Sequence, residues 1–331
     1  MWGVGKQAHI PLTTSHAFFL YFGAMSLARR LLIRASRSPW LAEQFRRRAF
    51  ARRAVRRFLP GEDLGAALDA AAAFAKSGIG SVLTQLGEQV RSAADAEAVR
   101  DHYLMVLDGI RARKLAAHLS IKLTHLGLEA DAAWCRRAVD ELAAKAKAAG
   151  SFLWIDMEES GYVDATLDIY RGARGAGAEV GVCLQAYLRR TPKDLERLLP
   201  LRPAIRLVKG AYSEPSHVAF PKKADVDLAY FALAERLLTE ARASRATPVF
   251  GTHDERLIER IRARAAELKT ARGIYEFHLL YGIRADAQRR LAAAGEKVRV
   301  LISYGTAWFA WYMRRLAERP ANIWFVLRNL I

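Results

Sequence analysis

The chain has 331 residues, 52% of them hydrophobic, and a formal net charge of +18 at pH 7. This length allows either one domain of barrel size with additions or two domains, and it is long enough to bury a large core. Cys135 and Cys183 are the only cysteines, and no Cys-x-x-Cys or histidine-rich spacing is present, so a disulfide framework and a metal site are both disfavoured and a reducing compartment is expected.

The N-terminal 61 residues are predicted to form a basic helical arm. Residues 16–60 are typical of two or three helices, broken near Pro39 and closed by Pro60-Gly61. Eleven arginines and one acidic residue, Glu43, lie between positions 29 and 57. This imbalance is compatible with an anionic membrane surface, a nucleic acid, an acid-poor targeting segment or simply a solvated helical face.

Membrane insertion has little support in the sequence. No apolar run reaches the roughly 18 residues that a membrane-spanning helix needs. The apolar stretch at 17–22 is short and is not followed by a signal-peptide cleavage site. We therefore expect a cytoplasmic protein, or a mitochondrial matrix protein in a eukaryote, with peripheral contact to the inner membrane as an option for the basic arm.

From Glu62 onward, short apolar runs alternate with longer amphipathic stretches. The predicted strands are 79–86, 119–123, 152–155, 180–184, 205–208, 248–250, 275–280 and 298–302. The predicted helices are 64–76, about twenty residues ending near 115, 131–149, 163–174, 192–199, 225–242, one opened by Asp254, one from Asp286, and one over 311–319. Asp63 and Thr191 are expected N-caps, and Gly78 is expected to end the first helix.

Eight strand–helix units predict a parallel sheet that closes into a (βα)8 barrel over residues 62–331, preceded by the arm at 1–61. The competing architecture is an open, doubly wound sheet. Dinucleotide binding of the Rossmann kind has no support, because the first strand–helix join lacks the G-x-G-x-x-G pattern.

In a (βα)8 barrel, polar residues at the C-terminal ends of the strands face the active site. Seven of the eight predicted strands place a polar group there, namely Glu88, Lys122, Asp156, Gln185, residues 206–209, Thr252 with His253, and Glu276. Lys122 inside a buried strand needs a partner, and Asp156 is the nearest candidate. His253 could instead be a packed histidine beside a helix start, and Gln185 could merely satisfy backbone groups.

Arg314 and Arg315 are adjacent in the last predicted helix, which should end near Pro320. Guanidinium groups bind carboxylates through two parallel hydrogen bonds, so this pair could hold a small carboxylate ligand. The alternative is a solvated basic face with Arg314 paired to Glu318. Cationic groups outnumber acids among the candidate residues, which predicts an anionic ligand or cofactor.

Seven short motifs stand out along the chain: SIKLTHLG at 120–127, IDMEES at 155–160, LQAYL at 184–188, IRLVKGAY at 205–212, FGTHD at 250–254, YEF at 275–277 and YMRRLAERPAN at 312–322. Together they resemble the motifs of the proline dehydrogenase family, which consists of flavin enzymes of proline catabolism. The resemblance runs in family order from about residue 60 to the C-terminus, and it implies a distorted (βα)8 barrel.

The resemblance also implies FAD as cofactor and particular roles for the matching residues. Asp156 and Arg206 would be catalytic, with Arg206 near flavin N5, and Lys122 would lie beside the substrate. Arg314 and Arg315 would bind the substrate carboxylate, and Glu88 would pair with Arg314 and close the site. The implied cofactor-binding residues are Met157, Gln185, Lys209, Gly210, Ala211, Thr252 and His253. Electrons would pass to a membrane quinone.

Leu301 departs from the family pattern. Aligned back from Arg314, this position in typical members is a tyrosine that packs on the proline ring. Leucine keeps an apolar wall but loses the phenol, so hydroxyproline or another N-heterocyclic or N-alkylated amino acid becomes a candidate substrate. The alternative function is a basic nucleic-acid-binding or membrane-binding module on an inactive barrel, which the arginine cluster of the arm would support.

Overall fold

The computed structural model describes residues 55–87 and 90–309, together with the single positions 38, 40, 44, 312 and 313. One compact unit spans Arg53–Thr306, and a second contains Met1–Arg52 and Ala307–Ile331. The helices predicted within 16–60 and at 311–319 therefore lie almost entirely outside the described residues. The predicted boundary after residue 61 stays a prediction.

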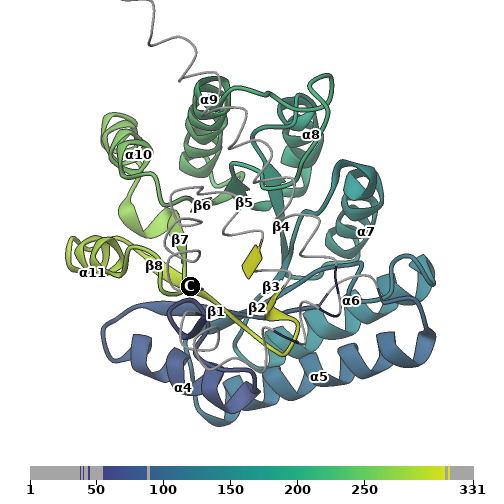
Figure 1. The fold of residues 1–331 in the computed structure, drawn as a ribbon. Coiled ribbons are helices and arrows are strands. Elements are labelled where there is room, and N and C mark those ends of the chain that lie inside the picture. The colour runs from purple at the N-terminus through teal and green to yellow at the C-terminus, as the bar shows by residue number, and fades with distance from the viewer. Residues whose placement is uncertain are drawn as a thin grey trace, which may run out of the picture. The chain divides into compact units, whose positions relative to one another are not determined.

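Eight parallel strands form a closed barrel in sequence order, with β8 paired to β1. The strands are β1 (Gly80–Gln85), β2 (Ala117–Ile121), β3 (Leu153–Ile155), β4 (Val180–Gln185), β5 (Ala204–Val208), β6 (Thr247–Gly251), β7 (Glu276–Leu280) and β8 (Val298–Tyr304). Figure 1 shows the strands at the centre of a ring of helices. The predicted (βα)8 barrel is confirmed, and the open doubly wound sheet is excluded.

The α-helices and the strands alternate along the described chain, beginning with α4 and ending with β8. They are α4 (Leu64–Ala75), α5 (Ala93–Ala112), α6 (Ala132–Ala148), α7 (Val163–Gly175), α8 (Thr191–Leu198), α9 (Lys223–Arg242), α10 (Glu255–Glu267) and α11 (Ala285–Ala293). Asp63 caps α4 as predicted, accepting a hydrogen bond from the Ala66 N–H at 2.8 Å. The helix α4 precedes β1 and packs against both β1 and β8.

The predicted cap by Thr191 is wrong. Thr191 is the first residue of α8, and its hydroxyl donates to the backbone carbonyl of Gln185 at 2.6 Å instead of accepting from the helix. The threonine thus ties the start of α8 to the end of β4. Pro192 still occupies the first turn, where its missing N–H costs nothing.

Strand alternation separates two layers of side chains. On β5, Ile205 and Leu207 belong to the large apolar core shared with the helices, whereas Arg206 lies between them on the opposite face of the strand. A small second cluster of Val82, Trp154 and Val249 fills part of the barrel interior. The barrel is therefore a packed structure rather than a pore.

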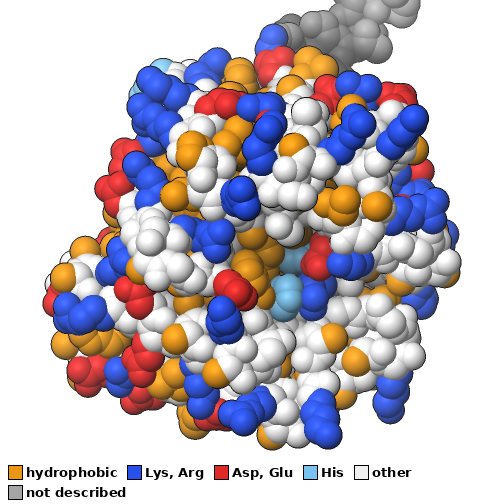
Figure 2. Space-filling view, turned by 180° about the vertical axis from the view of Figure 1, so that it is seen from behind, with side chains coloured by type: hydrophobic (Ala, Val, Ile, Leu, Met, Phe, Trp, Pro, Cys, Tyr) orange, Lys and Arg blue, Asp and Glu red, His pale blue; other side chains and the backbone are white. Residues whose placement is uncertain are grey.

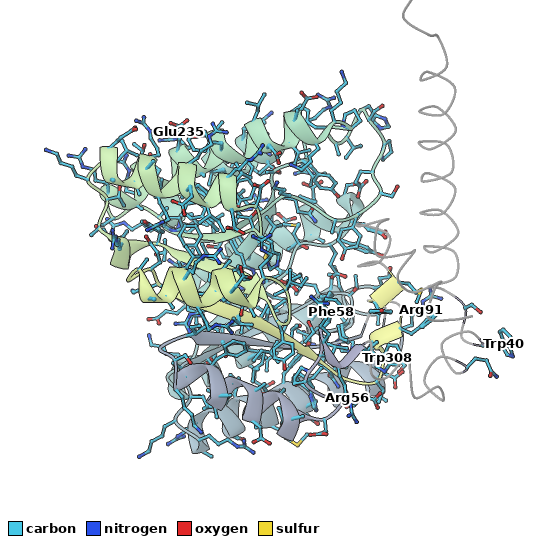
Figure 3. All side chains as sticks on the ribbon, turned by 60° about the vertical axis from the view of Figure 1, so that its left-hand side comes forward. Trp40, Arg56, Phe58, Arg91, Glu235 and Trp308 are labelled. Atoms are coloured by element: carbon cyan, nitrogen blue, oxygen red, sulfur yellow. The ribbon has the colours of Figure 1, made fainter. Side chains whose placement is uncertain are left out.

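The two ends of the barrel can be followed in Figure 3, which views it from the side. Arg91, in the loop between β1 and α5, marks the end towards which the strands run, and Glu235 on α9 lies towards the opposite end. Within the described part of the chain, no helix combines the length and the apolar character that crossing a bilayer would require.

Candidate active site

An ion-pair centre inside the barrel joins residues of β2, β4 and β5 with Asp156, which follows β3. Arg206 Nη2 donates to the hydroxyl of Ser120 at 2.7 Å and also to the carboxylate of Asp156. Arg206 Nε donates to the sulfur of Cys183 at 2.8 Å. The Ser120 hydroxyl in turn donates to Asp156 Oδ1 at 3.0 Å, and Lys122 Nζ lies 3.8 Å from Asp156 Oδ2. Four neighbouring strands thus fix one carboxylate between two cations.

The predicted pairing of Lys122 with Asp156 is confirmed, although its setting differs from the prediction. The strand β2 ends at Ile121, so Lys122 follows the strand rather than lying inside it. At this position its side chain is 16% exposed, so the ammonium retains some hydration while it faces the carboxylate. The prediction assumed the full free-energy cost of burying an unpaired lysine. Because this ammonium is partly hydrated, only part of that cost arises.

The electrostatics of the centre keep Asp156 ionised. Burial alone would raise the pKa of Asp156, but the positive charges of Arg206 and Lys122 outweigh burial and hold this pKa below its ordinary value. Two cations and one anion leave the centre with a net charge of +1. An electron-rich ligand beside it would be stabilised.

Two buried polar atoms near this centre have no hydrogen-bond partner among the described residues. They are Nη1 of Arg206, a donor, and Oε1 of Gln185, an acceptor. The other end of the Gln185 amide is fixed, because its Nε2 donates to the Met157 carbonyl at 3.3 Å. Buried polar atoms are almost always paired in folded proteins, so this donor and this acceptor indicate a place for a polar ligand.

Lys209, which follows β5, takes part in a four-residue charge network. Its ammonium lies 2.5 Å from Asp227 and 2.8 Å from Asp254, and Lys223 contacts the same two carboxylates. Burial opposes the ionisation of both aspartates, but hydrogen bonds from Lys209 lower their pKa values below the ordinary range. The network fixes the position of Lys209 and offsets its charge.

Thr252 and His253 follow β6, as the sequence predicts. The hydroxyl of Thr252 accepts from the backbone N–H of Asp254 at 3.2 Å, and Asp254 caps α10. Nε2 of His253 accepts from the backbone N–H of Leu280 at 3.2 Å, so the neutral ring carries its proton on Nδ1. This contact ties the end of β6 to the end of β7.

The turn after β5 depends on a glycine at position 210. Gly210 has φ of +110°, and an added Cβ would lie 2.2 Å from the ring of Tyr187. Only glycine combines this backbone conformation with so close an approach. Ala211 follows as an exposed residue, whereas Met157, which follows β3, is buried.

Beneath the ion-pair centre, Trp154 forms the floor of the candidate site. The Arg206 guanidinium carbon lies 5.1 Å from the centroid of the indole ring, close enough for a cation–π contact. Leu301 packs against the cluster of Trp154, Val82 and Val249. The structure therefore places Leu301 in the interior of the barrel, next to this floor.

The prediction that Glu276 lies near the mouth is wrong. Glu276 is the first residue of β7, so it lies at the N-terminal end of the barrel. There it accepts from Arg299 Nε at 2.9 Å, and its Oε2 lies 3.2 Å from His278 Nε2. The prediction assumed that the polar residue of this strand comes last, but here it comes first.

Two histidines complete this lower layer, which we call the basal cluster (His118, Glu276, His278 and Arg299). Trp154 Nε1 donates to His118 Nδ1 at 3.2 Å, which connects the cluster to the floor of the site. Burial lowers the pKa of His278 to about 4, and burial together with Arg299 lowers the pKa of His118 well below its ordinary value. Both rings are therefore neutral at pH 7.

Glu88, Arg314 and Arg315 lie outside the described residues. Their roles as gate and carboxylate clamp stay predictions. Among the other predicted residues, Lys122, Asp156 and Arg206 meet in one ion-pair centre, and Lys209, Thr252 and His253 lie in the loops after β5 and β6.

The sequence reasoning missed Ser120 and Cys183, which both contact Arg206. Each lies between two apolar residues of a buried strand, so each must face away from the helices. The alternation of the strand was the signal that could have identified them. The partners of Lys209 could not be found in this way, because Asp227 lies on a helix eighteen positions away.

The opposite end of the barrel carries a cleft of about 530 Å³, lined in part by Arg262, Thr270, Tyr275 and Glu296. Tyr275 and Glu296 precede β7 and β8, so this cleft lies at the N-terminal ends of the strands. In (βα)8 proteins that end contributes to stability rather than to catalysis.

The charged side chains of one face of the molecule can be seen in Figure 2, which views it from behind. Lys and Arg are scattered there among Asp and Glu, without one dominant patch.

Comparison with known proteins identifies the sequences that this chain resembles. The sequence model of the family described as proline dehydrogenase matches residues 67–328. A proline dehydrogenase from Deinococcus radiodurans is 37% identical over 314 residues, covering 92% of this chain and 98% of the relative. Proline dehydrogenase 1 from Bacillus subtilis subsp. natto is 34% identical over 277 residues, covering 84% and 90%.

Solved structures of larger proteins share the fold. Proline utilization A from Bdellovibrio bacteriovorus superposes with a TM-score of 0.75 at 22% identity, covering 81% of this chain and 33% of that protein. A mutant of proline utilization A from Bradyrhizobium japonicum gives a TM-score of 0.70 at 26% identity, covering 82% and 31%. The chain spans about a third of these proteins, which are therefore similar to it in one region only.

Proposed function

Because this chain belongs to the proline dehydrogenase family, whose members are oxidoreductases acting on CH–NH bonds, we propose that it oxidises L-proline or a related N-substituted amino acid with FAD as the electron acceptor. The product would be an imine of the Δ1-pyrroline-5-carboxylate type. The observation that carries this proposal is the buried Arg206 guanidinium, held by Asp156, Ser120 and Cys183, whose Nη1 has no partner within the described part of the chain.

The polar atoms of the site suit a flavin. The edge of an isoalloxazine ring offers both acceptors and an N–H donor, and the site supplies a donor in Arg206 Nη1 and an acceptor in Gln185 Oε1. In the proposed arrangement FAD would be held by eight residues, namely Met157, Gln185, Arg206, Lys209, Gly210, Ala211, Thr252 and His253. The backbone of Gly210, which has no side chain in the way, would allow close approach of the cofactor.

Bound FAD would supply two-electron chemistry, as the acceptor of a hydride from the carbon next to the substrate nitrogen. The protein's residues orient the reactants and set the charge around them. Arg206 would stabilise negative charge that develops beside it, and Asp156 with Lys122 would shape the field around the substrate amine. The reactive amine is the deprotonated form, and the ionised Asp156 is an acceptor that can keep such an amine oriented.

The substrate carboxylate is proposed to bind Arg314 and Arg315, with Glu88 pairing to Arg314 to close the site. We expect Arg315→Met to raise KM for proline about 10- to 100-fold, because a charge-assisted hydrogen bond contributes about 1.5–3 kcal/mol and each 1.4 kcal/mol is a factor of ten. Steady-state kinetics measure this effect. The exposed Arg289 on α11 provides the matched control, Arg289→Met. Equal KM values for the two variants would refute the clamp.

Substrate range is proposed to depend on Leu301, which packs beside the Trp154 floor. We expect Leu301→Tyr to shift the ratio of kcat/KM values towards L-proline over hydroxyproline and N-methylated amino acids by about tenfold, the usual effect of filling a small part of a pocket. Leu301→Phe adds the aromatic ring without the hydroxyl group, so it separates the effect of bulk from the effect of the hydroxyl. An unchanged ratio in both variants would remove Leu301 from the substrate site.

A quinone is the proposed electron acceptor, and the arginine-rich arm is proposed to dock on an anionic membrane, where each basic residue near the surface contributes about 1 kcal/mol. A short-chain quinone should then reoxidise the proline-reduced protein. Sedimentation with vesicles should depend on their content of anionic lipid. Binding to neutral vesicles alone would contradict the docking proposal.

The absorbance spectrum of the purified protein tests the proposed function directly. A yellow protein whose flavin bands are bleached by proline or a related amino acid, and restored by a quinone, is the expected result. A colourless protein that takes up no FAD, and that binds DNA with a steep salt dependence, would instead favour the nucleic-acid-binding module.

A further inference from the structure

The orientation of Arg206 depends on a contact that lies outside its ion pair with Asp156. A guanidinium group carries five N–H donors in a rigid fork. In Arg206, Nη2 is used by Ser120 and Asp156, and Nε is used by the sulfur of Cys183 at 2.8 Å. Nη1 has no partner among the described residues. The contact to sulfur therefore holds Nε, while Ser120 and Asp156 hold Nη2.

Cys183 contacts both members of the ion pair. Its sulfur accepts from Arg206, and its own S–H group donates to Asp156 Oδ1 at 3.6 Å. Burial raises the pKa of the thiol to about 12, so the group is protonated and neutral at physiological pH. A neutral thiol can serve as acceptor and donor together without adding a second negative charge beside Arg206.

This neutrality matters for the charge that Arg206 presents. A carboxylate at position 183 would offset the guanidinium, and the ion-pair centre would lose its net charge of +1. An apolar residue would leave Nε without an acceptor, and the guanidinium could then rotate to form two parallel bonds with Asp156, the geometry that arginine prefers with carboxylates. Either change would reduce the positive field on the side of Nη1.

We propose that Cys183 is a positioning residue, which holds the Arg206 guanidinium in the orientation that leaves Nη1 for the cofactor. This inference rests on the proposed flavin chemistry, because Nη1 is taken to face the isoalloxazine ring. It assigns a specific role to a thiol that neither Asp156 nor Ser120 can replace, since both contact Nη2 and neither contacts Nε.

The test compares Cys183→Val, which removes both hydrogen bonds, with Cys183→Ser, which keeps a donor and an acceptor. The matched control is Cys135→Val, because Cys135 is the other buried cysteine and lies on α6. For Cys183→Val we expect kcat to fall about fivefold with KM for proline within about twofold, since one hydrogen bond contributes about 1 kcal/mol. Cys183→Ser should recover most of the loss.

A second readout does not depend on turnover. A cation held beside the flavin favours its reduced form, so the midpoint potential of bound FAD should be more negative in Cys183→Val than in the wild type, the Cys183→Ser protein and the Cys135→Val control. If Cys183→Val does not fold, as judged by thermal unfolding, Cys183→Ala is measured in the same way.

The outcomes separate the two proposals. A wild-type protein that binds no FAD refutes the proposed function. A wild-type protein that binds FAD, together with a Cys183→Val protein that matches Cys135→Val in both kcat and midpoint potential, refutes the positioning role of Cys183 and leaves the proposed function standing.

Discussion

Replacing Arg206 with methionine is expected to lower kcat about 10²- to 10³-fold, the usual effect of removing one preorganised donor from the place where charge develops. The same change should destabilise the protein. Arg206 is 5% exposed and Asp156 20% exposed, and breaking a buried ion pair from one side costs about 3–5 kcal/mol. The lower end of this range applies, because Asp156 keeps Lys122 as a second partner.

Steady-state kinetics and urea unfolding measure the two effects separately. Arg206→Lys keeps the charge but not the rigid fork, so it should recover stability more than activity. Adding Asp156→Asn to Arg206→Met removes the carboxylate that has lost its Arg206 partner and should restore part of the lost stability. If Arg206→Met keeps kcat within threefold of the wild type, Arg206 does not act on the reacting groups.

Acidification from pH 7 to pH 4 is expected to reduce the free energy of unfolding through the basal cluster. The pKa of His278 is about 4 in the folded protein, below its ordinary value of 6.5, so the unfolded chain binds this proton first as the pH falls. The stabilisation is present above pH 6.5 and is lost progressively towards pH 4. The difference corresponds to a loss on the order of 3 kcal/mol from this residue.

Glu276 adds to the same trend. Burial would raise the pKa of Glu276, but the hydrogen bond with His278 and the charge of Arg299 hold it below its ordinary value of 4.5. Its contribution is therefore present above pH 4.5 and is lost as the pH falls further. Urea unfolding at a series of pH values measures the sum. The His278→Gln variant should lose less stability between pH 7 and pH 4 than the wild type, and an equal loss would show that His278 does not titrate as described.

The barrel itself could be predicted from the sequence because its signals are local. Each strand is a short apolar run, and each following helix has its own apolar stripe, so the order of elements is visible without any contact between distant residues. The position of Asp156 followed from the same reasoning, since the residue after a strand lies at the C-terminal end of the barrel.

The remainder of the candidate site could not be predicted, because it depends on the residue at which each strand begins and ends. Glu276 and Arg206 both belong to buried strands, but one begins β7 and the other lies in the middle of β5, so their depths in the barrel differ. The boundaries of short strands are uncertain by a few residues when only apolar runs are visible. For Lys122 an error of two residues changed a supposedly buried ammonium into one at the rim.

The packed interior of the barrel has a consequence for the order of the reaction. Trp154, Val82 and Val249 are at most 2% exposed, and the basal cluster lies beneath them, so small molecules have no route along the barrel axis. If FAD binds above this floor as proposed, its reductant and its oxidant would have to reach it from the same end of the barrel, one after the other. In such a ping-pong mechanism the first product leaves before the second substrate binds, and the initial rates give parallel lines in double-reciprocal plots.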